Sequence, residues 1–387
     1  MDNLRADPAS LLAELIAIDS SNPDLVPGAA GESEIADFVS EWLSARGFDI
    51  HRLEETPGRP SIVAVAKGTG GGRSLMLNGH LDTVTLAGYD GDPLEPVVRD
   101  GSMHGRGAFD MKAGIAAMMV AAADAARTPH AGDIMLALVA DEEYGSAGTE
   151  EVLRSFSADA AIVTEPSHLE VTLAHRGFAW FTIMVEGVAA HGSRPDLGID
   201  AIAKAGYFLV EVDRWARWLA DGPAHPVLGT GSVHASVITG GEELSSYPAH
   251  CAVSIERRTV PGENADTVEA ELRAILDSIS ATQPDFVYRI ERGLERLPFQ
   301  AADDEPIVQT TLAVVERVTG RPAIRRGEPF WTDCALLAEA GIPCLLFGVD
   351  GGGAHAATEW VTLESLDTVT TVLHDIIIDY CGSADAA

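Results

Sequence analysis

Lysine is almost absent from this sequence, and acidic residues greatly outnumber basic ones. Only Lys67, Lys112 and Lys204 occur among 387 residues. Together, 26 lysines and arginines stand against 59 aspartates and glutamates, which gives a net charge of −33. A protein that binds nucleic acid needs Lys and Arg side chains to neutralise phosphates. We therefore exclude nucleic acid as a partner, and an anionic substrate would need a local arginine.

Long apolar runs and paired cysteines are also missing. No segment approaches the roughly 20 apolar residues that a membrane-spanning helix requires. The first residues, MDNLRADPASLLAEL, lack the basic and apolar regions of a secretory signal. The four cysteines (Cys251, Cys334, Cys344 and Cys381) show neither close pairing nor zinc-knuckle spacing. These absences predict a cytoplasmic protein with reduced thiols and no membrane contact.

The length of the chain and its apolar patterns predict two domains. Helix and strand signals alternate through the first 175 residues, with strands expected at 61–67, 74–79, 133–140 and 160–164. These strands are apolar without alternation, which is typical of a mostly parallel sheet covered by helices. The glycine-rich residues 68–72 join two of these strands and are expected to form a hairpin turn.

The segment from about 177 to 292 has a different order of elements, β-α-β-β-α-β, which is that of a ferredoxin-like domain. The α/β pattern resumes after Leu297. We therefore predict an α/β catalytic domain formed by 1–176 and 294–387, with a ferredoxin-like α+β domain inserted at 177–293. Neither glycine-rich stretch (68–72, 348–353) has the strand–glycines–helix context of a dinucleotide site.

Acidic and histidine side chains follow five short apolar segments. They are His80 and Asp82 in LMLNGHLDTV, Asp110 in GRGAFDMKAG, Glu142 and Glu143 in IMLALVADEEYG, Glu165 in AAIVTEPS, and His355 in CLLFGVDGGGAH. Open α/β sheets place their sites beyond the carboxyl ends of the strands. Two histidines with several carboxylates are the ligand set of a zinc-type hydrolase rather than of a magnesium or calcium site.

Each of these residues also has an ordinary interpretation. Asp110 could cap a helix, Glu142 and Glu143 could be solvated loop acids, Glu165 could belong to a turn, and His355 could lie in a free loop. Their joint occurrence favours a two-metal site instead. Because Glu142 and Glu143 are adjacent, one could bind metal while the other takes a proton from water.

Seven segments resemble the metallohydrolase family of acetylornithine deacetylase, succinyl-diaminopimelate desuccinylase, aminoacylase and carboxypeptidase G. In chain order they are GHLDTV, DGSMHGRGAFDMKAG, DEEYGSAGT, TEPS, AAHGSRPDLGIDAI, IERRTVPGE and HAATEWV. The resemblance implies a two-metal catalytic domain and an inserted lid domain through which two subunits form a homodimer. Zinc is the metal it implies first, with cobalt or manganese as alternatives.

The resemblance also implies a ligand set for two divalent ions per subunit. His80 and Glu165 would bind one ion, Glu143 and His355 would bind the other, and Asp110 would bridge the two.

Further roles follow from the same resemblance. Asp82 would orient the first histidine ligand, and Glu142 would act as the general base. His191, in the predicted lid, would reach the partner subunit's site and stabilise the developing oxyanion. Arg258 would grip the carboxylate of the substrate, whereas its neighbour Arg257 should point to the opposite face of the same strand.

The predicted function is metal-dependent hydrolysis of the amide bond in an N-acyl-L-amino acid. In the family, Glu at position 165 is typical of deacylases and carboxypeptidases, and Asp is frequent in aminopeptidases. A carboxypeptidase or dipeptidase using the same site is the nearest alternative. A non-catalytic relative that binds amino acids or peptides would be expected to lack some ligands or the base, and none is missing here. Thr85 and Asp200 depart from the Pro and Asn that the family usually shows.

Overall fold

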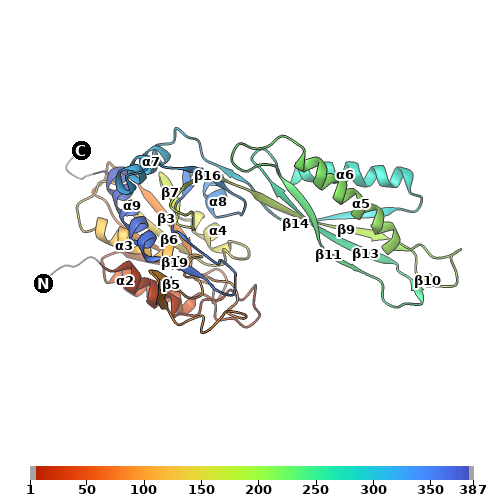
Figure 1. Cartoon of the computed structure of the whole chain (residues 1–387), viewed down its shortest axis with the longest axis horizontal. Coiled ribbons are helices and arrows are strands. Elements are labelled where there is room, and N and C mark those ends of the chain that lie inside the picture. The colour runs from red at the N-terminus through yellow and green to blue at the C-terminus, as the bar shows by residue number, and fades with distance from the viewer. Residues whose placement is uncertain (1–5, 383–387) are drawn as a thin grey trace. The chain divides into compact units, whose positions relative to one another are not determined.

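A computed structural model describes residues 6–382, which form two compact units (Figure 1). Unit 1 contains the chain up to Leu173, Ala301–Arg326 and the chain from Thr332 onward, and unit 2 contains Ala174–Gln300 and Gly327–Trp331. The assignment of 177–293 to a lid domain stays a prediction. The ends of the predicted catalytic domain, 1–5 and 383–387, lie outside the described residues.

Unit 1 combines helices with a large sheet and a small one. Its helices are α1 (Pro8–Ile16), α2 (Ser33–Ser44), α3 (Lys112–Ala125), α4 (Ala147–Leu153), α7 (Pro306–Thr319), α8 (Cys334–Glu339) and α9 (Leu363–Cys381). The large sheet contains β1 (Asp49–Leu53), β2 (Ser61–Ala66), β3 (Leu75–His80), β6 (Ile134–Val139), β7 (Ala160–Val163), β8 (Val171–His175), β15 (Phe299–Gln300), β16 (Arg325–Glu328) and β17 (Cys344–Leu346). Of these strands, β15 and the last residues of β8 and β16 fall within the bounds of unit 2. The small sheet contains β4 (Val97–Arg99), β5 (Ser102–His104), β18 (Gly351–Gly352) and β19 (Trp360–Thr362).

The large sheet is mixed. The expectation of a mostly parallel sheet is therefore right for its central strands and wrong for its outer strands. The strand order is β1-β2-β6-β3-β7-β17-β8-β15, with β16 beside β8. The four central strands, β6, β3, β7 and β17, run parallel. The outer pairs β1–β2, β2–β6, β17–β8 and β8–β15 are antiparallel. Strands β2 and β8 are buried along their whole length, and such a strand has the same apolar composition in either orientation, so the sequence could not distinguish the two orientations.

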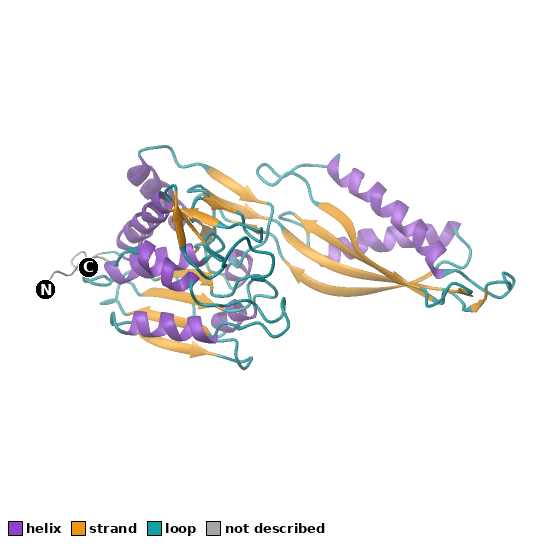
Figure 2. Ribbon diagram, turned by 60° about the horizontal axis from the view of Figure 1, so that its bottom comes forward, coloured by secondary structure: helices purple, strands orange, loops and turns teal. Residues whose placement is uncertain are grey.

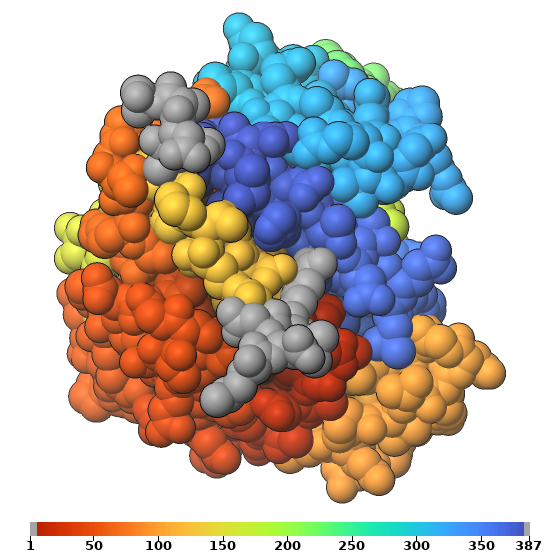
Figure 3. Space-filling view, turned by 90° about the vertical axis from the view of Figure 1, so that its left-hand side faces the viewer, coloured from red at the N-terminus to blue at the C-terminus, as the bar shows by residue number. Residues whose placement is uncertain are grey.

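Helices cover both faces of this sheet (Figure 2). On one face, Leu75 and Leu77 of β3 belong to the main hydrophobic core together with side chains of α1, α2, α3, α7 and α9. On the other face, Asn78 donates a hydrogen bond to Thr149 of α4, and α8 packs on β7 and β17. Figure 3 shows the surface of unit 1, where segments from the two ends of the sequence (red and blue) lie side by side, as the contact of α1 with α9 requires.

The glycine-rich residues 68–72 do not form the expected hairpin turn. Strands β2 and β3 both pair with β6, which lies between them, so the loop crosses a neighbouring strand rather than joining two paired ones. Gly68, Gly72 and Gly132 pack against backbone atoms closer than a Cβ atom would allow. Because glycine has no Cβ atom, these residues allow the backbone segments to lie close together where the loop crosses β6.

Unit 2 is a four-stranded antiparallel sheet with two helices on one face (Figures 1 and 2). Its elements follow the predicted order, which is confirmed: β9 (Gly177–Glu186), α5 (Ala201–Ala220), β11 (Ser232–Gly240), β13 (His250–Thr259), α6 (Ala265–Thr282) and β14 (Val287–Arg296). The strand order is β11-β13-β9-β14. Alternate residues of β9, such as Phe181 and Ile183, belong to one hydrophobic core together with Phe208 of α5 and Leu272 of α6. A two-residue ladder joins β10 (Ala190–His191) to β12 (Ser246–Tyr247).

Two further expectations concern cysteines and membrane contact. All four cysteines are buried free thiols, as predicted. Within 6–382, none of the helices has both the length and the apolar character to cross a membrane.

Candidate metal centre

The central parallel strands of unit 1 bring several predicted ligands to one edge of the large sheet. His80 is the last residue of β3, Glu142 and Glu143 follow β6, and Glu165 follows β7. Because β6, β3 and β7 are parallel neighbours, their carboxyl ends meet at the same edge. The side chains therefore converge although up to 85 positions separate them in the sequence.

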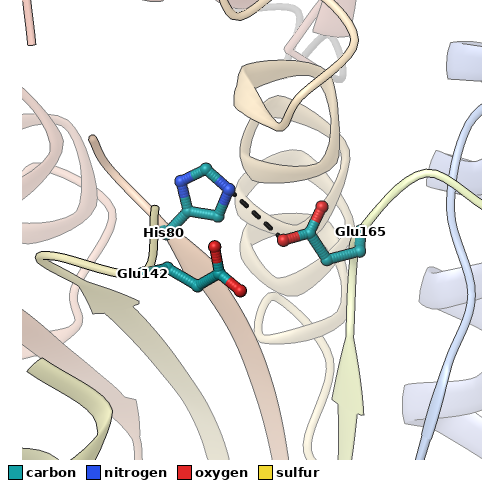
Figure 4. Close-up of side chains that lie close together, drawn as sticks. All are labelled: His80, Glu142 and Glu165. Carbon is teal, nitrogen blue, oxygen red and sulfur yellow. Dashed lines mark ion pairs between the residues drawn. The ribbon is translucent and has the colours of Figure 1, made fainter. Parts of the chain in front are cut away.

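His80 lies at the centre of this cluster and is fully buried. Its Nε2 atom is 3.1 Å from Asp110 Oδ1 and 3.2 Å from Glu165 Oε1. Figure 4 shows the ion pair with Glu165 and the carboxylate of Glu142 directed toward the same space. Burial alone would lower the pKa of His80, but the carboxylates of Glu165, Asp110 and Asp82 raise it well above its usual value.

The second histidine joins the cluster through two carboxylates. His355 Nε2 is 2.9 Å from Glu143 Oε2 and 3.4 Å from Asp110 Oδ2. Asp110 thus faces both histidines, one with each carboxylate oxygen. The ligand atoms of His80, Asp110 and Glu143 lie within 4.8 Å of one another, and so do those of His80, Glu142 and Glu165. The five predicted ligands and the predicted base are therefore brought together in one place.

The carboxylates of the cluster are poorly stabilised by the protein itself. Burial, and next the charge of Asp110, raises the pKa of Glu165 to about 8 and that of Glu143 to about 7. Burial also raises the pKa of Glu142 well above its usual range, against the favourable charge of His80. Several buried carboxylates this close together repel one another unless protons or cations compensate them.

Divalent cations fit this arrangement. Glu143 Oε1 is buried and has no hydrogen-bond partner among the described residues. A buried carboxylate oxygen without a partner is costly, and a cation would satisfy it. Imidazole nitrogens together with carboxylate oxygens are the ligands that zinc-type ions accept. Cations would also remove the repulsion that raises the carboxylate pKa values.

Asp82 contacts both the histidine and the turn that carries Glu142 and Glu143. His80 Nδ1 is 2.8 Å from the main-chain carbonyl oxygen of Asp82 and 3.6 Å from its carboxylate. The carboxylate accepts the backbone N–H groups of Glu142 at 3.1 Å and of Glu143 at 3.2 Å. The side chain of Asn22 donates to the same carboxylate at 2.7 Å. Asp82 thus fixes the main chain of the two glutamates as well as the ring of the histidine.

The turn after β6 is held by a buried network that sequence reasoning missed. Asp141 has a positive φ of 69°, and its carbonyl oxygen accepts N–H groups from the end of the turn. Arg59 donates to Asp141 at 2.9 Å and to both oxygens of the fully buried Glu32 at 2.6 and 2.7 Å. Asn22 also donates to Asp141, at 3.1 Å. Nothing in the local sequence distinguishes these residues from surface polar residues.

A second buried pair, Arg106 and Glu359, was also missed, although both residues stand inside the motifs GRGAFD and HAATE. Their nitrogen and oxygen atoms are 3.0 Å apart, and Glu359 is fully buried. The sequence did contain a signal for this pair. Arg106 stands four residues before the predicted ligand Asp110, and Glu359 stands four residues after the predicted ligand His355.

The two remaining predicted site residues belong to unit 2. His191 is exposed at the end of β10, and its Nδ1 atom is 2.8 Å from Ser193 Oγ. Arg258 lies on β13, where it donates to Glu256 at 2.7 Å and its guanidinium lies 5.4 Å from the ring centre of Phe178. Arg257 points to the opposite, buried face of the strand, as the alternation predicted. The roles of His191 and Arg258 stay predictions.

Comparison with known proteins supports the resemblance read from the motifs. The sequence pattern of peptidase family M20/M25/M40 matches residues 76–379. The chain is 30% identical to acetylornithine deacetylase of Myxococcus xanthus over 393 residues, which cover 96% of this chain and 97% of that one. It is 29% identical to N-formyl-4-amino-5-aminomethyl-2-methylpyrimidine deformylase of Bacillus subtilis, with coverage of 92% and 91%. The crystal structure of a dinuclear metal-binding peptidase of the M20 family from Bacillus subtilis is similar in fold, with a TM-score of 0.71, 17% identity and coverage of 96% and 98%.

Proposed function

The chain belongs to peptidase family M20/M25/M40, and from this premise we propose that it hydrolyses the amide bond of an N-acyl-L-amino acid with two divalent metal ions. The observation that carries the proposal is the convergence of His80, His355 and three carboxylates at one edge of the sheet. Relatives named as a deacetylase and a deformylase both remove a short acyl group, and they match more than nine-tenths of the chain.

The ligands divide between two ions. His80 and Glu165 would hold one ion, Glu143 and His355 would hold the other, and Asp110 would bridge them because it faces both histidines. When bound, such ions acidify water and polarise a carbonyl group. Zinc suits this ligand set first, and cobalt or manganese would also suit it.

Glu142 is the proposed general base. Its carboxylate takes the proton of the attacking water and later passes it to the nitrogen of the leaving amine. Burial raises the pKa of Glu142, so its carboxylate is a stronger base than that of an exposed glutamate. Asp82 supports this role, because its carboxylate accepts the backbone N–H group of Glu142.

We assign substrate contacts to two residues of unit 2. Arg258 would bind the carboxylate of the acyl amino acid, a task that the planar guanidinium performs with two parallel hydrogen bonds. His191 would donate a hydrogen bond to the oxyanion that forms in the site of the other subunit. If so, mixing the inactive variants His191→Ala and Glu142→Gln should restore activity, because a mixed dimer contains one site with both groups intact. No recovery after subunit exchange would place His191 outside the site.

The proposed homodimer uses the edge of the unit 2 sheet formed by β11. This strand has an exposed face and no second strand partner among the described residues. Helix α5, which packs beside β11, exposes Tyr207, Val210 and Trp218. The opposite edge, β14, adjoins α6, whose described residues include no exposed large apolar side chain. An unpaired edge strand next to apolar side chains suits pairing with a second copy.

The two edges of the sheet provide a matched test. Val237 on β11 and Val287 on β14 are 56% and 53% exposed, respectively. Because a charge on a strand edge opposes pairing, Val237→Lys should yield monomers in light-scattering measurements, whereas Val287→Lys should remain dimeric. Dimers of both variants would exclude β11 as the interface.

The reaction is tested with chelated enzyme assayed on N-acyl amino acids and dipeptides, with and without added zinc. Release of the amino acid from one acyl class, restored by zinc, is the expected result. Cleavage of dipeptides alone would support the carboxypeptidase or dipeptidase alternative at the same site. No turnover by enzyme shown to hold zinc would favour a non-catalytic relative.

We also place the protein in the cytoplasm, because its four cysteines are free and buried. Recovery of the protein from a secreted or periplasmic fraction would contradict this.

A further inference from the structure

One buried ion pair connects the two loops that carry Asp110 and His355. Arg106 stands four residues before Asp110, and Glu359 stands four residues after His355. Arg106 Nη1 is 3.0 Å from Glu359 Oε2, and both side chains are buried. The small sheet brings these loops together, since Trp360 of β19 pairs with His104 of β5.

The carboxylate of Glu359 fixes the main chain that leads to Asp110. Oε2 accepts the N–H group of Gly107 at 2.9 Å in addition to the bond from Arg106. Oε1 accepts the N–H groups of Phe109 at 3.0 Å and of Asp110 at 2.9 Å. Four donors therefore converge on one carboxylate, and the Asp110 backbone cannot shift without breaking one of these bonds.

The guanidinium of Arg106 extends this connection to His355. Its Nη2 atom donates to the carbonyl oxygen of Ala356 at 3.0 Å, and its Nε atom donates to that of Thr85 at 3.1 Å. One planar group thus holds Glu359 and two main-chain carbonyl oxygens at once. A lysine, which carries its donors on a single nitrogen, cannot reach all three.

Arg106 provides a side-chain anchor for the segment that follows His355. Two main-chain hydrogen bonds also hold this segment, from Ala356 to the carbonyl oxygen of Gly353 at 3.0 Å and from Asp90 to that of Ala357 at 2.7 Å. The side chain of His355 is 54% exposed, and its backbone has a positive φ of 59°. Its ring contacts only the two carboxylates of the metal cluster among the ion pairs described. The bond from Arg106 to the carbonyl oxygen of Ala356 lies one residue from His355 along the chain. It therefore fixes the main chain from which the imidazole ring extends.

We infer that Arg106 and Glu359 are positioning residues that set the spacing between Asp110 and His355. They thereby determine the affinity of the ion that Glu143 and His355 would hold, which is called the second ion below. This inference rests on the proposed two-metal function. Groups that orient metal ligands from outside the coordination shell typically change metal affinity by about 10- to 100-fold when they are lost. The loss should be greater for the ion held by Glu143 and His355, because the connection to Ala356 serves that ion alone.

The test is a titration of chelated protein with zinc, followed by calorimetry and by counting bound metal. Arg106→Lys should weaken the second equivalent about 10- to 100-fold and leave the first nearly unchanged. His355→Ala is the reference variant, because it removes a ligand of the second ion directly. Glu359→Gln keeps the size of the side chain but cannot accept all four hydrogen bonds, so it should weaken both equivalents. Because Arg106 also loses its charged partner, the ion held by Glu143 and His355 should be weakened more, and this difference is the test if Arg106→Lys does not fold.

Arg257→Lys is the matched control. Arg257 is equally buried, and it also donates to a carboxylate (Glu263) and to a main-chain carbonyl oxygen (that of Arg258), but it lies in unit 2. The Arg257→Lys protein should bind both ions with wild-type affinity even if its thermal stability falls.

The outcomes separate the inference from the proposed function. Wild-type protein that binds two ions, with the second selectively weakened in Arg106→Lys, supports both. Wild-type affinities for both ions in Arg106→Lys and Glu359→Gln would overturn the inference and leave the proposed function intact. Equal weakening of both ions in Arg106→Lys would also overturn it, because the arginine would then support the fold in general. Wild-type protein that binds no metal would remove the proposed function itself.

Discussion

The carboxylate of Asp82 accepts the backbone N–H group of Glu142 at 3.1 Å, and the same carboxylate accepts that of Glu143 at 3.2 Å. The loop after β3 is thereby fixed to the turn after β6, although 60 residues separate them. The proposed base and one proposed ligand thus share a single anchor. The sequence predicts that Asp82 orients His80. The folded chain shows that Asp82 also holds the main chain of Glu142 and Glu143.

This relationship predicts the behaviour of Asp82→Asn. An amide has one acceptor oxygen, so it cannot accept both N–H groups, and the turn should shift. We expect the catalytic rate or the metal affinity to fall about 10- to 100-fold, as measured by steady-state kinetics at several zinc concentrations. Asp92→Asn is the control, because Asp92 is an exposed carboxylate that accepts one backbone N–H group, from Leu94. If Asp82→Asn changed neither the rate nor the metal affinity, the anchoring role would be contradicted.

Glu142→Gln should separate catalysis from metal binding. Glutamine has nearly the same size but cannot accept a proton, so the rate should fall by about 100- to 10,000-fold. Two equivalents of zinc should still bind, as measured by metal analysis after dialysis. Glu143→Gln should instead lose zinc, since that side chain is a proposed ligand. Full activity in Glu142→Gln would remove Glu142 from the role of base.

The metal-free protein should lose stability as the pH rises. The pKa of Glu165 is raised from 4.5 to about 8, and that of His355 is raised from 6.5 to about 10. In both cases the folded state holds protons that the unfolded state has released, so the free energy of unfolding falls with increasing pH across this range. Melting temperatures of chelated protein should be lower at about pH 9 than at about pH 6.

Zinc provides the control for this pH dependence, because bound cations take the place of the protons. The zinc-loaded protein should therefore show a much smaller change in melting temperature over the same range. A chelated protein that becomes more stable with rising pH would contradict the predicted sign.

The network around Arg59 should contribute strongly to stability. Arg59 pairs with the fully buried Glu32 and with Asp141. Removing one partner of a buried ion pair leaves an uncompensated charge, which typically costs about 3–5 kcal/mol. We expect this loss in the free energy of unfolding of Arg59→Ala, measured by urea denaturation of the metal-free protein.

Arg52→Ala is the matched comparison. Arg52 also pairs with two carboxylates, those of Asp37 and Glu54, but at the surface. An exposed pair contributes only about 0–1 kcal/mol. Equal losses in the two variants would show that burial of the Arg59 network does not matter to stability.

The sequence alone determined where the candidate ligands stand and what they are. His80, Glu143 and Glu165 each occur at or just after an apolar run, and such runs form buried strands because their side chains leave water on both faces. Strand ends are a local property, so they can be read from a few consecutive residues. The order of elements in unit 2 was predictable for the same reason, since each element has its own period of apolar residues.

The tertiary structure decided what local patterns do not encode. The orientation of the outer strands of the large sheet depends on which strands become neighbours, and an apolar strand suits either orientation. The hydrogen bond between Glu142 and Asp82 joins residues 60 positions apart, and the one between Arg106 and Glu359 joins residues 253 positions apart. The sequence marked Asp82 only as a partner of a histidine, and it marked Arg106 and Glu359 only as charged residues inside two motifs. Only burial in the folded chain requires them to find partners, and those partners hold the site.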